Sequence, residues 1–139
     1  PNNHGLLDED EIAAYSAENF LTAWSIDPTK IFVFLIYADE SLAGFALVVS
    51  LPLVDGKKDN LIHDFFLFRA YRGKNIGKFS AIQIFDQSKG SWKLRVLPKN
   101  KPALTFWQKV ISNYSNNNFA RQEVQFQGSQ MIEFSFYSS

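Results

Sequence analysis

A basic turn that carries two glycines joins an apolar segment to a segment with helical periodicity. Residues 65–78 read FFLFRAYRGKNIGK. The first backbone N–H groups of a helix have no intrahelical acceptor and the helix dipole favours negative charge, so such a turn can bind an anion. Gly73 and Gly77 would let a phosphate approach the backbone, and several cationic side chains surround them. A pyrophosphate would suit this turn, whereas a basic loop that merely connects a strand to a helix would have the same composition.

Other chemical motifs match the sequence poorly. Three rather than four residues separate Gly73 from Gly77, and Phe79 stands where a Walker loop has the Ser or Thr that binds magnesium. The sequence contains neither the dinucleotide-binding pattern G-x-G-x-x-G nor the hydrolase pattern G-x-S-x-G. Because the chain has no cysteine and only two histidines, we expect no disulfide, no cysteine nucleophile and no metal site.

Length and charge narrow the class of protein. The 139 residues, 46% of them hydrophobic, are enough for one domain, and the net charge of zero argues against a nucleic-acid-binding protein. Residues 1–56 carry a net charge of −8 and residues 57–101 a net charge of +8. Either these segments pair on one surface, or the basic segment binds a phosphate-bearing ligand. The longest apolar run, 31–38, is too short to span a membrane and no signal peptide opens the chain, so we expect a cytoplasmic protein.

The periodicity of the sequence predicts three helices and six strands. A helix is expected over 8–24, and a helix from Asn75 ends at a C-cap on Gly90. Asn100 is a suitable N-cap for a third helix that reaches Tyr114. Strands are expected at Ile31–Ala38, Leu42–Leu51, Leu61–Arg69, Trp92–Leu97, Phe119–Gln127 and Met131–Tyr137, with a polar loop over Pro52–Asn60.

This order of elements predicts an α/β (α+β) fold with a single mixed sheet flanked by helices. The strand, helix and strand over 61–97 form a crossover unit, which should place the two strands parallel. The apolar residues on both faces of 61–69 indicate a central position in the sheet.

Several segments together resemble the GNAT superfamily of N-acetyltransferases. The turn Arg72-Gly73-Lys74-Asn75-Ile76-Gly77 is similar to the family's pyrophosphate loop, R/Q-x-x-G-x-G/A. The strand at 65–68 precedes this loop, the span 42–47 resembles the family's "laGfa" strand, and 100–107 resembles its Asn followed by a helix that begins A-x-x-F-Y. The resemblance covers about 30–137. It implies one GNAT-like domain over 1–139 that lacks the family's first strand and helix, either as a fragment or as a variant of the acceptor site.

The resemblance also implies which residues would bind acetyl-CoA. The loop amides would bind the pyrophosphate, Leu67 and Phe68 would pair with the pantetheine through their backbone, and Asn100 would contact the pantetheine arm. Trp107 stands where the family usually has a tyrosine that protonates the departing thiolate, and Asn75 replaces a glycine. The loop residues concerned are Arg72, Gly73, Lys74, Asn75, Ile76, Gly77 and Lys78.

The resemblance predicts an N-acetyltransferase that moves an acetyl group directly from acetyl-CoA to the amine of a small molecule or peptide. Asp64 and His63 are the candidate bases, and as neighbours in a strand they are expected on opposite faces of the sheet. Because indole cannot act as a general acid, either the thiolate leaves unaided or a residue such as Tyr114 supplies the proton. A non-catalytic acyl-CoA-binding or sensory module is the alternative. A homodimer through the Phe-rich segment 119–137 is compatible with both.

Overall fold

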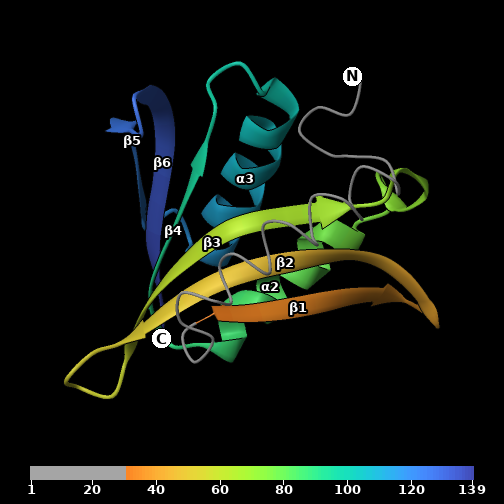
Figure 1. The fold of residues 1–139 in the computed structure, drawn as a ribbon, viewed down its shortest axis with the longest axis horizontal. Helices are drawn as coiled ribbons and strands as arrows, with labels where there is room; N and C mark the ends of the chain where they lie inside the picture. Colours follow the sequence, from red (N-terminus) through yellow and green to blue (C-terminus); the bar gives the residue numbers. More distant parts are fainter. Residues whose placement is uncertain (1–30) are drawn as a thin grey trace.

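The computed structural model describes residues 31–139, which form a six-stranded mixed sheet with two helices and one 3₁₀ turn (Figure 1). The strands are β1 Ile31–Ala38, β2 Ser41–Pro52, β3 Lys58–Leu67, β4 Gly90–Val96, β5 Phe119–Phe126 and β6 Ser129–Ser138. The helices are α2 Ile76–Gln87 and α3 Lys101–Tyr114, and the 3₁₀ turn is Arg69–Tyr71. The predicted fold class is confirmed. The helix predicted over 8–24 lies outside the described residues.

The strand order β1-β2-β3-β4-β6-β5 makes β3 and β4 the central pair of the sheet. They are parallel, as the crossover through α2 predicts, and all the other neighbouring strands are antiparallel. The β5–β6 hairpin turns through Gln127 and Gly128, whose φ angles of 51° and 80° suit a two-residue hairpin turn. None of the helices within 31–139 has the length and apolar character needed to cross a membrane.

Both helices pack against the same face of the sheet, with α3 beside β4 and α2 behind β1 and β2 in Figure 1. Phe85 of α2 is fully buried, and its ring centroid lies 5.2 Å from that of Trp92 and 4.7 Å from that of Phe136. Full burial of one such side chain stabilises a fold by about 1.5–3 kcal/mol. The Phe-rich segment thus supplies core residues, since Phe134 and Phe136 are both buried.

A polar cluster fixes the paired end of the two central strands. The amide oxygen of Asn60, which is 1% exposed, accepts hydrogen bonds from the hydroxyls of Ser50 (2.6 Å) and Ser88 (2.8 Å). Its amide nitrogen donates to the Ser91 carbonyl at 3.1 Å. These bonds join β2, β3, β4 and the end of α2, and they satisfy a polar group that would otherwise be costly to bury.

Several predicted boundaries shift. β3 begins at Lys58, inside the predicted loop, and it ends at Leu67 because the chain turns into the 3₁₀ segment. The C-cap prediction for Gly90 is wrong: α2 is capped at Ser88, and Gly90 opens β4 with a φ of +134°. A side chain at Gly90 would collide with the carbonyl oxygen of Lys58, so this glycine is required by the close approach of β4 to β3.

Replacement of Gly90 should therefore destabilise the fold by two effects at once. We expect Gly90→Ala to lower the free energy of unfolding by at least about 2 kcal/mol, from backbone strain and from the collision. Gly56→Ala is the matched control, since Gly56 also has positive φ (+81°) but no atom near its Cβ position; it should cost only about 1 kcal/mol. Urea denaturation measures both. Equal losses would contradict the role given to the Lys58 contact.

Candidate functional site

The two central strands pair over a short distance and then separate. β3 and β4 are paired from Lys58 and Gly90 to Ile62 and Leu94, although β3 continues to Leu67. Figure 1 shows them diverging from their shared beginning, with α3 at the opening. Beyond Ile62, the edge of β3 that faces β4 therefore has no partner strand among residues 31–139.

A β-bulge lies where the divergence begins. Ile62 pairs with Val48 of β2 and Asp64 pairs with Leu47, so His63 is an extra residue in β3. A bulge interrupts the alternation of faces along a strand. His63 and Asp64 consequently lie close enough for their side chains to hydrogen-bond, with His63 Nδ1 2.8 Å from Asp64 Oδ2. The prediction that they occupy opposite faces is wrong.

The bulge also determines which side chains reach the helices. Before it, Ile62 belongs to the core beneath the helices; after it, Phe65 packs there against Trp107, with ring centroids 5.2 Å apart. The pair His63 and Asp64 falls between these positions and lies on the opposite face, where Leu47 is the partner of Asp64.

A cleft of about 500 Å³ occupies the opening on the helix side. Its walls come from β3, from the turn before α2 and from α3. The residues that line it are Phe65, Leu67, Arg72, Gly73, Asn75, Gly77, Lys78, Pro102, Ala103, Phe106, Trp107, Lys109, Val110 and Asn113.

The turn before α2 has the backbone conformation of an anion cradle. Gly73 (φ 76°) and Asn75 (φ 64°) both have left-handed backbone conformations. Asparagine tolerates this conformation better than most residues, which explains how Asn75 can replace the glycine of the family that the sequence resembles. Asn75 is the N-cap of α2, but its side chain makes no capping hydrogen bond, which leaves the first N–H groups of the helix available. Gly77 is buried, and a Cβ there would lie 3.1 Å from Leu67 Cδ1. Its lack of a side chain lets the helix start lie against β3.

Cationic side chains add to this cradle. The Arg72 Nε donates to the Leu67 carbonyl at 3.3 Å, which ties the turn to the end of β3. Burial, and secondly the charge of Arg69, lower the pKa of Arg72, but an arginine stays protonated. A bound anion would relieve this repulsion. Lys78 also lines the cleft, whereas the exposed Lys74 does not.

Leu67 and Phe68 are both expected to pair with a ligand through their backbone, and only Leu67 has its backbone directed toward the cleft. The Phe68 N–H donates to the Ala43 carbonyl of β2 at 2.8 Å and so points away from the opening. Because successive peptide groups alternate along a strand, the N–H and carbonyl of Leu67 and of Phe65 point toward the edge of β3 that has no partner strand among residues 31–139, and the Leu67 carbonyl there already accepts from Arg72 Nε. Leu67 is therefore the better placed backbone partner, and Phe68 is not.

Three predicted residues have structural contacts that bear on their roles. The Asn100 side chain accepts from the Ala103 N–H at 3.3 Å and caps α3, as its sequence context predicts, and it does not line the cleft. Trp107 is 7% exposed and forms part of the cleft wall. The Tyr114 hydroxyl, one turn from the cleft, donates to Asp86 at 2.6 Å. Burial first and this bond second raise the Tyr114 pKa, which makes it a poor acid.

Sequence reasoning missed much of the α3 wall. Lys109 and Asn113 line the cleft, as do Phe106 and Val110, which follow the apolar periodicity of the helix. The same periodicity assigns them to the core, and only the divergence of β3 and β4 shows that part of this stripe faces open space.

The His63 and Asp64 pair is an electrostatic unit. The His63 side chain is 53% exposed and that of Asp64 is 9% exposed. Because an ionised carboxylate only accepts, His63 Nδ1 carries the proton and Nε2 is left as the basic atom. The hydrogen bond to Asp64 is the main cause of a raised His63 pKa, while burial and the nearby Arg95 oppose it.

These features define an α/β domain whose cleft opens between two diverging parallel strands, with a basic turn at a helix start on one side and a titratable pair at the divergence. The model of the acetyltransferase (GNAT) family matches residues 4–111. The chain belongs to this family.

Solved structures share the fold. Arabidopsis thaliana Naa50 in complex with a bisubstrate analogue, CoA-Ac-MVNAL, superposes with a TM-score of 0.66 at 14% identity, over 96% of this chain and 96% of that one. A Bacillus subtilis acetyltransferase in complex with CoA superposes with a TM-score of 0.65 at 11% identity, over 97% of this chain and 96% of that one. No protein of curated function matches the sequence.

The hydrogen bond within the pair predicts a measurable titration. We expect Asp64→Asn to lower the His63 pKa, since it removes the carboxylate that raises it. The raised pKa in the folded state also means that the pair stabilises the fold at low pH, and that this contribution is lost as the pH rises through the folded-state pKa. NMR titration of the His63 ring protons, assigned with His63→Gln, measures the shift. An unchanged His63 pKa would contradict the coupling.

Proposed function

We propose that the protein is an N-acetyltransferase that transfers an acetyl group from acetyl-CoA to an amine, directly and in a ternary complex. The observation that carries this proposal is the divergence of β3 and β4 between the anion cradle and the His63–Asp64 pair. Membership of the acetyltransferase family supports it, as do the CoA ligand and the CoA analogue named for two proteins of the same fold.

The residues present fit the proposed coenzyme. The space beside Gly73 is empty at its Cβ position, so a phosphate can approach the N–H groups at the start of α2. Arg72 and Lys78 would neutralise pyrophosphate charge, and Leu67 would pair with the amide-bearing arm. The apolar wall around Phe106 and Trp107 suits the alkyl parts of that arm.

Acetyl-CoA, when bound, supplies the thioester carbonyl carbon that an amine attacks and a thiolate leaving group. The protein's task is to remove a proton from the amine as the C–N bond forms and the C–S bond breaks. We assign this step to Nε2 of His63, with Asp64 holding the ring through Nδ1. A thiol has a pKa of about 8.5, so its thiolate can leave without the acid that Trp107 cannot provide.

A second candidate function is non-catalytic binding of an acyl-CoA. Two observations favour it. Trp107 stands where the family usually has its tyrosine acid, and the Tyr114 hydroxyl donates to Asp86. The two functions share the cradle and differ in turnover.

The cradle is tested by coenzyme binding. We expect Arg72→Ala with Lys78→Ala to weaken CoA binding at least tenfold, because both side chains line the cleft and hydrogen bonds to charged groups contribute about 1.5–3 kcal/mol each. Lys89→Ala with Lys99→Ala removes the same charge from exposed residues outside the cleft and is the control. Calorimetric titration measures both. If the two double variants bind CoA alike, the cradle is refuted.

The base is tested by turnover. His63→Gln should lower kcat about a hundredfold, a usual contribution of a positioned base, with CoA affinity unchanged. Asp64→Asn should also lower kcat, by less, because it removes only the group that orients the ring.

The activity of the unmodified protein should rise as the pH rises through the raised His63 pKa, and Asp64→Asn should move this rise to lower pH. A free-thiol assay over a panel of amines follows the reaction. Full activity of His63→Gln would overturn the assignment, and CoA binding without thiol release on any amine would favour the second candidate.

A further inference from the structure

An arginine on the sheet face opposite the helices lies at the point where the strands diverge. Arg95 follows Leu94, the last residue of β4 that pairs with β3. It faces away from Trp92, Leu94 and Val96, which alternate with it and are buried under the helices. It is close enough to His63 to oppose the protonation of that ring. Because Leu94 pairs with Ile62 in the parallel ladder, Arg95 and His63 are the next residues on the two strands, at the point where the strands separate.

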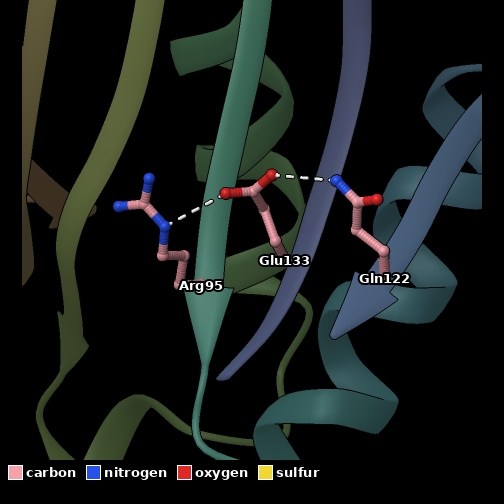
Figure 2. A network of polar contacts seen from close by, with 3 residues as sticks. All are labelled: Arg95, Gln122 and Glu133. Atoms are coloured by element: carbon pink, nitrogen blue, oxygen red, sulfur yellow. Dashed lines mark hydrogen bonds and ion pairs between the residues drawn. The ribbon is translucent and has the colours of Figure 1, made fainter. Parts of the chain in front are cut away.

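The orientation of Arg95 is fixed at one nitrogen. Its Nε donates to Glu133 Oε2 at 3.1 Å, and Gln122 Nε2 lies 3.5 Å from the other carboxylate oxygen (Figure 2). The Glu133 side chain is 11% exposed and that of Arg95 is 22% exposed. The guanidinium carbon also lies 4.3 Å from the centroid of the Phe126 ring. Within residues 31–139, the hydrogen bond and the ring contact of Arg95 involve Nε and the face of the guanidinium, and neither uses its two terminal nitrogens.

The two terminal nitrogens of Arg95 form that outer edge. Figure 2 shows them pointing away from Glu133, on the β3 side of β4. Within residues 31–139, Glu133 is the hydrogen-bond partner of Arg95 and it takes only Nε. An arginine held in this way presents two parallel N–H donors, the geometry that binds a carboxylate with two hydrogen bonds.

We propose that Arg95 binds a carboxylate of the acceptor, so that the acceptor is a small amine that also carries a carboxylate, such as a free amino acid. This inference rests on the proposed function, because it places the acceptor's amine at His63 and its carboxylate at the Arg95 terminal nitrogens. An acceptor without an anionic group would leave these donors unpaired once water is excluded, and a polyamine would bring a second positive charge toward the guanidinium.

Paired substrates test the proposal. Thiol release is measured for each of the twenty L-amino acids and for its carboxamide, which keeps the side chain and replaces the carboxylate by a neutral group; diamines and short peptide amides complete the panel. We expect kcat/KM for the preferred amino acid to exceed that for its carboxamide at least tenfold. Arg95→Lys should raise KM for the amino acid at least tenfold with a smaller change for the carboxamide.

Two further variants keep the test independent of folding. Arg95→Gln combined with Glu133→Gln removes both charges together and avoids an unpaired buried carboxylate; it should bring the ratio of the two substrates close to one. Arg121→Gln is the matched control, because Arg121 also lies over an aromatic ring (Phe134, 5.5 Å) but donates to Gln108 on the helix side. It should leave the ratio unchanged.

The outcomes separate this inference from the proposed function. Turnover of carboxamides or diamines as fast as amino acids, or a ratio that survives the Arg95 variants, would overturn the carboxylate site while leaving a transferase. If no amine is acetylated, the transferase fails, and NMR titration of amino acids into CoA-saturated protein then decides the site. Binding that is weakened at least tenfold by Arg95→Lys supports it, and equal binding, or none, refutes it.

Discussion

The structure depends on how briefly β3 and β4 pair. The Asn60 cluster holds their first residues together, and pairing stops at Ile62 and Leu94. Beyond that point the Phe65 and Trp107 rings meet edge to face between β3 and α3, with an interplanar angle of 76°. Aromatic rings packed there keep α3 against β3, so the space left by the missing ladder becomes a cleft with an unpaired strand edge along one side. The cradle at the start of α2 lies at the same opening.

One extra residue adapts β3 to this arrangement. Without the bulge at His63, strict alternation would put Phe65 and Leu67 on the face opposite the helices and Asp64 beneath them. The insertion reverses the alternation, so apolar side chains line the cleft while His63 and Asp64 lie together on the other face. The same local irregularity therefore serves packing and chemistry, which is a common role of bulges beside functional sites.

Local rules of the sequence predict the elements well. The Asn100 cap and the parallel crossover follow from residue type and spacing, and the structure confirms both. The predictions that were wrong concern features that tertiary contacts determine. The faces on which His63 and Asp64 lie depend on a bulge that no residue type in β3 predicts. The need for glycine at position 90 depends on the neighbouring backbone of Lys58. The Lys109 and Asn113 wall exists only because the strands separate.

The two arginines around the divergence have different surroundings. Burial and the charge of Arg69 lower the pKa of Arg72, so an anion bound at the turn before α2 would be attracted by both guanidinium groups. The charge of Arg95 is already balanced by Glu133, which accepts from Nε. A ligand at Arg95 therefore contributes mainly by accepting hydrogen bonds from the two terminal nitrogens, rather than by neutralising the charge. A zwitterion adds no net charge, and it matches both the basic nitrogen of His63 and the free edge of the guanidinium.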